Sequence, residues 1–205
     1  MMLRMGLTGG IASGKSVVAA MLRELGFPVL EADVVAHLLI EPGQPAHDEV
    51  LRVFGNGLVG ADGRIDRGKL GVIVFADPAK LVRLNKIIHP RVEEAVFRQF
   101  EDWRRQGVRD AGFVVAALLV EAGYGKNLDG MVVVFCRPEQ QLERLLARGM
   151  SEADAKRRIA SQMPVEEKLR HATEKIDCSG TMEQTREQVV ALAEKLRKQS
   201  AVKRG

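Results

Sequence analysis

Apolar positions at the start of the chain follow the pattern of a short buried strand that leads into a helix. Leu3, Met5 and Leu7 are apolar and alternate with other residues, and the stretch Val17–Leu25 has helical periodicity. Between them lie the mostly small residues Gly9–Ser16. The chain is therefore predicted to begin with a strand, a glycine-rich loop and a helix, in that order.

Further apolar runs predict four more strands, and helical periodicity fills the segments between them. The strand runs are 27–31, 112–121, 131–136 and 175–178. Helices are predicted over 34–40, 46–54, from an Asp66 cap to Phe75, from Asp77-Pro78 to a break at His89-Pro90, from there to Arg105, and over 138–150, 151–160 and 180–198. The basic tail 199–205 is predicted to fray.

The order of these elements predicts an α/β fold with a doubly wound, parallel, five-stranded sheet. Residues 44–107 show no convincing strand and are too many for a simple crossover, so we interpret them as part of a helical insertion. The arginine-rich helices over 138–171 are interpreted as a lid. The core of a single domain would then comprise 1–32, 108–137 and 172–205, with the insertion at 33–107.

Composition narrows the class of protein. The 205 residues are 46% hydrophobic with a net charge of +4, which suits anionic substrates but does not argue for nucleic acid. Cys136 and Cys178 are far apart, unlike the cysteines of zinc sites or disulfide-rich secreted domains. No signal peptide or membrane-spanning run is recognised. We therefore expect a soluble, cytoplasmic protein with no nucleic-acid or membrane partner.

Gly9–Ser16 fits the phosphate-binding pattern G-x-x-x-x-G-K-[ST] in its proper context, after a strand and before a helix. Glycines let backbone N–H groups turn inward around an anion, and the helix N-terminus adds its positive dipole. Lys15 would reach the β- and γ-phosphates of ATP, and the Ser16 hydroxyl would hold Mg²⁺. The pattern predicts a nucleoside triphosphate site and a P-loop NTPase fold; the alternative is an ordinary turn before a surface helix.

Other charged residues fit a kinase, although each has a structural alternative. Asp33 follows the second strand, which we place next to the first, so it could face Lys15 and take a proton from an acceptor hydroxyl, or it could cap a helix. Arg144 and Arg148 lie one helical turn apart and could contact phosphates, or form a solvated face. His37 and His89 are by themselves more typical of structural histidines.

Several motifs, in one order and with compatible gaps, resemble the dephospho-coenzyme A kinase family over nearly the whole chain. They are Leu7–Ser16, Glu31-Ala32-Asp33 with His37 and Leu38, Ile65-Asp66-Arg67 with Leu70, Val74-Phe75, Ile88-His89-Pro90, Leu118–Glu121, Gln141 with Arg144 and Arg148, and Gln162, Lys168, Ala172 and Ile176-Asp177. The chain departs from the family pattern at Glu31, Ala117, Thr173 and Cys178, where Asp, Pro, Asp and Asn are usual.

The resemblance implies transfer of the γ-phosphate of ATP, with Mg²⁺, to the ribose 3′-hydroxyl of dephospho-coenzyme A, the last step of coenzyme A biosynthesis (EC 2.7.1.24). It makes 33–107 the substrate subdomain and Asp33 the general base, with Lys15 and Arg144 as the other catalytic residues. The implied nucleotide contacts are Gly10, Ile11, Ala12, Ser13, Gly14, Lys15, Ser16, Val17 and Arg148. The implied substrate contacts are Thr8, Asp33, His37, Arg67, His89, Leu118 and Glu121.

Three alternatives to this function remain at the level of sequence. A nucleoside or nucleoside-monophosphate kinase would share the core and differ in its acceptor. A GTP-driven switch would carry Asn-Lys-x-Asp, but Asn85-Lys86 is followed by Ile87-Ile88. A nucleotide-binding module without turnover would need Asp33 to be remote from Lys15. We expect a monomer or a weak homo-oligomer.

Overall fold

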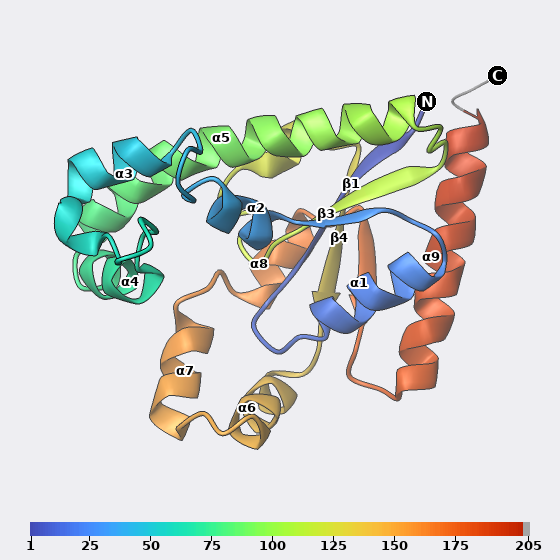
Figure 1. The fold of residues 1–205 in the computed structure, drawn as a ribbon. Coiled ribbons are helices and arrows are strands. Elements are labelled where there is room, and N and C mark those ends of the chain that lie inside the picture. Colours follow the sequence, from blue (N-terminus) through green and yellow to red (C-terminus); the bar gives the residue numbers. More distant parts are fainter. Residues whose placement is uncertain (203–205) are drawn as a thin grey trace. The chain divides into compact units, whose positions relative to one another are not determined.

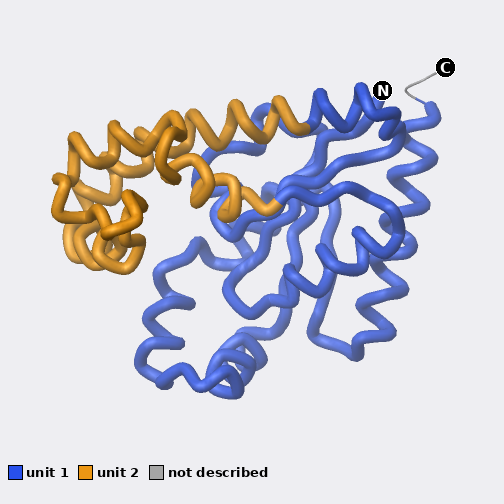
Figure 2. Tube along the Cα trace, in the orientation of Figure 1, with its two compact units in different colours: residues 1–30, 100–205 blue, residues 31–99 orange. Residues whose placement is uncertain are grey.

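The structure is a computed structural model that describes residues 1–202. It divides into two compact units (Figure 2). The first combines Met1–Leu30 with the chain from Phe100 onward, and the second is Glu31–Gln99. Each unit has its own hydrophobic core. The assignment of 33–107 to substrate binding and of 138–171 to a lid stays a prediction.

The predicted five-stranded parallel sheet is confirmed (Figure 1). Its strands are β1 (Leu3–Gly9), β2 (Val29–Glu31), β3 (Ala111–Val115), β4 (Gly130–Phe135) and β5 (Glu174–Asp177). The strand order is β2-β3-β1-β4-β5, so β3 lies between β1 and β2. The expectation that Asp33 and Lys15 follow adjacent strands is therefore wrong, because a strand later in the chain, β3, pairs between the two strands that precede them.

Nine α-helices occur in the described part of the chain. They are α1 (Lys15–Glu24), α2 (Ala32–Leu38), α3 (His47–Phe54), α4 (Arg67–Phe75), α5 (Pro78–Arg105), α6 (Pro138–Ala147), α7 (Glu152–Ala160), α8 (Val165–Arg170) and α9 (Met182–Val202). Short 3-10 turns cover Asn56–Leu58 and Tyr124–Asn127. Asp66 caps α4 as predicted, because its carboxylate accepts a hydrogen bond from the Lys69 N–H at 3.0 Å.

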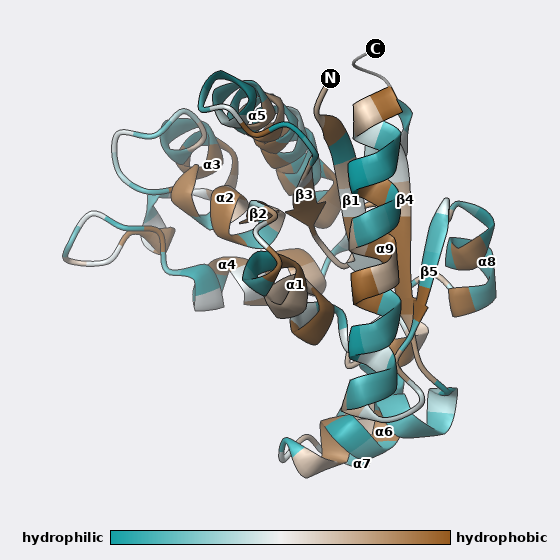
Figure 3. Ribbon diagram, turned by 90° about the vertical axis from the view of Figure 1, so that its right-hand side faces the viewer, coloured by the Kyte–Doolittle hydropathy of each residue, from teal (hydrophilic) through white to brown (hydrophobic). Residues whose placement is uncertain are grey.

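The core of the first unit joins one face of the sheet to α1 and α9, which lie along that face (Figures 1 and 3). Alternate residues of β1 point into it, as the period of two along a strand requires. They meet apolar residues of both helices, such as Leu22 of α1 and Leu196 of α9, which are almost completely buried. This packing fixes the start of α1, and with it the loop between β1 and α1.

The predicted break at His89-Pro90 is wrong, because α5 continues through Pro90. A proline inside a helix removes one backbone hydrogen bond and normally disfavours the helix. Here the Arg91 guanidinium donates to the Ile87 carbonyl oxygen at 2.6 Å, which adds a side-chain hydrogen bond beside the proline. Val92 and Val96 are buried one turn apart. Packing of this apolar face outweighs the local preference for a break.

The strand predicted over 112–121 is too long, because β3 ends at Val115. Its pairing with β1 ends at Leu7 and Val115, and β1 continues to Gly9 paired with β4. Without a partner strand the apolar run turns instead, and Leu118 is half exposed while Leu119 is buried. The run of apolar residues therefore predicted burial correctly at Leu119 but not the end of the strand.

Two further differences concern helices near the C-terminal part of the chain. Helix α8 was not predicted, since its six residues are too short to show a clear period. The tail was predicted to fray from residue 199, but α9 reaches Val202. Ser200 is completely buried there, and its hydroxyl donates to the Arg197 carbonyl at 2.9 Å. The rest of that prediction, for 203–205, lies outside the described residues.

The second unit contains a histidine that couples its stability to pH. The ring nitrogens of His47 lie 2.9 Å from the Asp48 carboxylate and 3.1 Å from the Gly63 carbonyl oxygen. Only a protonated ring donates to both acceptors. The hydrogen bond to Asp48, opposed by burial and helped by the bond to Gly63, raises the pKa of His47 above its usual 6.5.

We expect this unit to lose stability as the pH rises through the raised His47 pKa. The folded state binds the proton more tightly than the unfolded state, so the contribution is complete below pH 6.5 and disappears at higher pH. Thermal melts between pH 5.5 and 8.5 test this, and His47→Gln should flatten the pH dependence. His171→Gln, at an exposed histidine, serves as the control. An identical pH dependence in wild type and His47→Gln would contradict the expectation.

Candidate functional site

The loop between β1 and α1 has the backbone geometry of an anion cradle. Gly14 has φ 103°, and Ala12, with φ 58°, is the one non-glycine residue with positive φ among residues 1–202. These turns direct consecutive amides toward one side. Within the described structure, the N–H groups of Ala12, Gly14, Lys15 and Ser16 have no hydrogen-bond acceptor. Four donors at the start of α1 are therefore available to an anion.

The loop lies so close to the sheet that two of its glycines admit no side chain. A Cβ at Gly9 would collide with the Val134 carbonyl oxygen. A Cβ at Gly14 would lie 2.8 Å from the Sγ atom of Cys178, which is buried directly against the loop. The cysteine that replaces the usual family asparagine thus fills space under the cradle. Burial raises the pKa of the Cys178 thiol, which therefore stays neutral.

Side chains predicted to contact the triphosphate surround this cradle. Lys15 is half-buried and Ser16 and Val17 are exposed at the first turn of α1. Neither the Lys15 ammonium nor the Ser16 hydroxyl has a protein partner within the part of the chain that the structure describes. The Ser13 hydroxyl also has no hydrogen-bond partner there, but unlike that of Ser16 it is buried. The free ammonium and hydroxyl suit a triphosphate and a Mg²⁺ ion, which takes few protein ligands.

Three side chains from the arginine-rich helical segment contact the backbone of the loop. Gln141 of α6 donates to the Ile11 carbonyl oxygen at 2.8 Å, and Gln162, after α7, accepts from the Ile11 N–H at 2.7 Å. Arg144 donates to the carbonyl oxygens of Ala12 at 3.1 Å and Cys178 at 2.7 Å. The interpretation of Arg144 as part of a solvated face is therefore wrong, and its contact with phosphate stays a prediction. Arg148 ends α6 and is exposed.

A second group of polar contacts lies where β3 ends. The Thr8 hydroxyl donates to the Ala117 carbonyl oxygen at 3.1 Å, and so does the Lys168 ammonium at 2.6 Å. Lys168 is completely buried and pairs with the Glu121 carboxylate at 2.9 Å. Thr8 and Glu121 therefore have partners inside the protein, while Leu118 is half exposed. Their substrate contacts stay predictions.

The predicted acceptor-binding residues of the second unit have different surroundings. Asp33 is exposed in the first turn of α2, whose N-cap is Glu31 without a side-chain bond, so the interpretation of Asp33 as a helix cap is wrong. His37 is exposed in the last turn. Arg67 lines a polar cavity of about 420 Å³. His89 is half-buried, and burial lowers its pKa.

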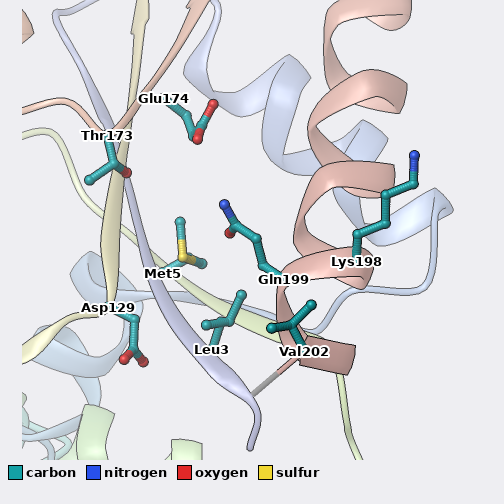
Figure 4. Close-up of a pocket in the computed structure, with 8 residues that line it drawn as sticks. All are labelled: Leu3, Met5, Asp129, Thr173, Glu174, Lys198, Gln199 and Val202. Atoms are coloured by element: carbon teal, nitrogen blue, oxygen red, sulfur yellow. The ribbon is translucent and has the colours of Figure 1, made fainter. Parts of the chain in front are cut away.

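One cavity of the first unit lies elsewhere along the sheet. It has a volume of about 570 Å³ and is lined by the first residues of β1, β5 and the end of α9, with no residue of the glycine-rich loop (Figure 4). Its carboxylates are already paired, Asp129 with Arg4 at 3.5 Å and Glu174 with Lys195 at 2.6 Å. It therefore does not compete with the loop as a phosphate site.

Residues 1–202 contain neither a cluster of metal-ligating side chains nor a membrane-spanning helix. No group of three or more His, Cys, Asp or Glu side chains is arranged to hold a metal ion. No helix among these residues combines the length and apolar character needed to span a membrane.

Sequence reasoning assigned no role to two residues of this region. Gln162 and Lys168 are polar residues in or near a short helix and carry no distinctive pattern of their own. Only the motif order of the family resemblance marked them. Gln141 is also marked only by that motif order, and its hydrogen bond to Ile11 shows that it is more than a helix surface residue.

Comparisons with known proteins agree with this geometry. The family model for dephospho-CoA kinase matches residues 3–184. The chain is 44% identical over 191 residues to the dephospho-CoA kinase of Bacillus anthracis, covering 93% of this chain and 95% of the relative. It is 47% identical over 187 residues to the dephospho-CoA kinase of Symbiobacterium thermophilum, covering 91% and 78% of the two chains.

Solved structures support the same conclusion. The dephospho-CoA kinase of Campylobacter jejuni superimposes with a TM-score of 0.74 at 28% identity, covering 97% of this chain and 98% of the other. Shikimate kinase from Acinetobacter baumannii, with a TM-score of 0.53 at 12% identity over 97% and 95% of the chains, shares the fold. By sequence over most of its length and by fold, the chain belongs to the dephospho-CoA kinase family.

Proposed function

We propose how the residues of this ATP-dependent kinase divide the work of the last step in coenzyme A biosynthesis, the phosphorylation of dephospho-coenzyme A. The observation that carries the proposal is the loop Gly9–Ser16, with four unpaired N–H groups at the start of α1. These donors bind the phosphates of ATP, and Lys15 places its charge on the β- and γ-phosphates. Gly10 to Val17 form the nucleotide site.

On the acceptor side, Asp33 orients the ribose 3′-hydroxyl and takes its proton as the transfer proceeds. Its carboxylate is exposed and caps no helix, so it is available for this role. Arg67 lines a polar cavity and has no ion pair among the described residues, whereas neighbouring Arg64 pairs with Glu41 at 3.1 Å. Arg67 therefore suits the diphosphate of dephospho-coenzyme A. His37, His89, Leu118, Thr8 and Glu121 complete the proposed acceptor contacts.

Ser16 would hold Mg²⁺, which would neutralise charge on the phosphates when bound. Arg144 and Arg148 of the lid, 138–171, would add positive charge and exclude water, because an open site would hydrolyse the triphosphate. The substrate subdomain is 33–107. The two free cysteines suit a reducing compartment, and we place the protein in the cytoplasm as a monomer or weak homo-oligomer.

A coupled assay of ADP release tests the function. With ATP and Mg²⁺, dephospho-coenzyme A should support rapid turnover, while AMP, CMP and nucleosides should not. A reaction without acceptor measures hydrolysis of ATP and should be slow. Equal rates with AMP or CMP would instead support a nucleoside-monophosphate kinase, and no ADP release with any acceptor would support a binding module.

A further inference from the structure

The backbone of Ile11, in the phosphate loop, is held on both sides of its Cα by side chains of two separate segments. The Ile11 N–H donates to the Gln162 oxygen at 2.7 Å, and the Ile11 carbonyl oxygen accepts from the Gln141 nitrogen at 2.8 Å. Because a peptide N–H only donates and a carbonyl only accepts, the Gln162 side chain must present its oxygen to Ile11 and the Gln141 side chain must present its nitrogen. We name these two side chains the amide clip.

The fit of the clip depends on the glycine that precedes Ile11. A Cβ at Gly10 would lie 2.6 Å from the Gln141 nitrogen and 3.6 Å from the Gln162 oxygen. The Gln141 amide therefore occupies the space that a side chain at this position would need, whereas Gln162 would be at ordinary contact distance. Glycine at position 10 lets Gln141 reach the backbone of the next residue.

The residue after Gln162 is held by one member of an ion pair whose lysine is buried. The N–H of the next residue, Met163, donates to the Glu121 carboxylate at 3.3 Å. The same carboxylate pairs with Lys168, which is completely buried and also donates to the Ala117 carbonyl oxygen. The Gln162 end of the clip is thus anchored to the turn after β3, and the Gln141 end is carried by α6.

An anion cradle requires its carbonyl oxygens to point away from the phosphates, since they would repel them. Gln141 holds the Ile11 carbonyl, and Arg144 holds the next one, that of Ala12, at 3.1 Å. The following N–H groups, at Ala12 and Gly14, are left without an acceptor in the described structure. The Ile11 carbonyl and the Ala12 N–H belong to one planar peptide group, so the clip orients the peptide that carries the first free donor.

We propose that Gln141 and Gln162 are positioning residues of the phosphate site, which fix the two peptide groups on either side of Ile11 so that the N–H groups from Ala12 onward face the triphosphate. The proposal rests on the proposed function of the loop. Neither glutamine touches the reacting atoms; each acts through the backbone that it holds. The loop is then ordered when the protein folds, so ATP binding does not have to order it.

Methionine is the variant of choice, because it keeps the length of glutamine and removes its hydrogen bonds. Gln188→Met is the matched control, because Gln188 holds the backbone of a residue outside the loop. Its side chain accepts from the Asp177 N–H and donates to the Asp177 carbonyl oxygen, both at 2.9 Å. Gln141→Met and Gln162→Met should each lower kcat/KM for ATP about tenfold, the effect of one lost hydrogen bond. Inhibition by adenosine, which has no phosphates, should be unchanged. Gln188→Met should leave both constants near wild type.

Glutamate variants distinguish the two ends of the clip. A glutamate at 162 keeps the acceptor for the Ile11 N–H, whereas a glutamate at 141 loses the donor for the Ile11 carbonyl. Hydrogen exchange at the Ile11 amide, measured without nucleotide, should stay slow in Gln162→Glu and become fast in Gln162→Met. At position 141, kcat/KM for ATP should be no higher in Gln141→Glu than in Gln141→Met.

Several results would overturn the positioning role. One is a kcat/KM for ATP in Gln141→Met and Gln162→Met that matches that of Gln188→Met. Others are a loss of adenosine binding as large as the loss in kcat/KM for ATP, and slow exchange at the Ile11 amide in Gln162→Met. Failure of the proposed function is distinguishable, because the wild-type enzyme would then release no ADP with dephospho-coenzyme A. Hydrogen exchange at the Ile11 amide, with and without inorganic triphosphate, would still test the clip. We expect this anion to protect the Ala12 and Gly14 amides in wild type and to protect them less in Gln162→Met.

Discussion

Asp33→Asn is expected to lower kcat by about 10²-fold or more while KM for ATP stays near wild type. Asparagine keeps the size of the side chain but cannot take the proton of the acceptor hydroxyl. ATP binding depends on the loop Gly9–Ser16, which the substitution does not alter. Steady-state kinetics with dephospho-coenzyme A as acceptor, together with direct titration of ATP, measure both parts of the expectation.

The structure supplies reasons to attribute such a loss to chemistry. Asp33 is exposed and caps no helix, so the variant should melt within a degree or two of wild type. Asp102→Asn, which removes a carboxylate from a surface ion pair with Arg105 on α5, is the matched control and should be active. Wild-type kcat in Asp33→Asn would eliminate Asp33 as the general base.

Lys15→Ala is expected to lower kcat/KM for ATP by about 10²- to 10³-fold. The Lys15 ammonium has no protein partner among the described residues, so its charge is available to the phosphates in both the ground state and the transition state. KM for ATP should therefore rise and kcat should fall together. Affinity for adenosine should not change, because adenosine carries no phosphate.

Lys80→Ala provides the control for removing one positive charge. Lys80 is half exposed and lies 3.9 Å from Asp77 at the start of α5. Its loss should change neither constant by more than about twofold, as expected for a surface ion pair. Unchanged kcat/KM in Lys15→Ala, or bound ATP that leaves Lys15 without a phosphate contact, would refute the assigned role.

The glycine-rich loop was predictable because its chemistry is local. Two of its features, the turns and the helix N-terminus, depend on residues within the pattern Gly9–Ser16 or directly beside it. The cap at Asp66 was predictable for the same reason, since the carboxylate bonds to an N–H three residues later. The existence of five strands followed from their apolar runs, and their parallel type followed from the helical segments between them.

The contacts around the loop were not predictable from any local pattern. Gln162 lies 151 positions from Ile11 and Lys168 lies 51 positions from Ala117, so only the folded chain brings each pair together. The continuity of α5 through Pro90 is similar, because burial of a helix face outweighed a local signal for a break. In each case the deciding energy comes from residues distant in sequence.

By itself, the sequence determined the phosphate loop, the α/β class of the fold and, through the order of its motifs, the family. Hydrophobic period and glycine spacing suffice for these features because each acts over one strand, one turn or one helix. Tertiary structure alone decided that β3 separates β1 from β2, that Arg144 lies against the Ala12 carbonyl and that two glutamines hold Ile11. Strand order and side-chain hydrogen bonds depend on how distant segments pack, which no local pattern encodes.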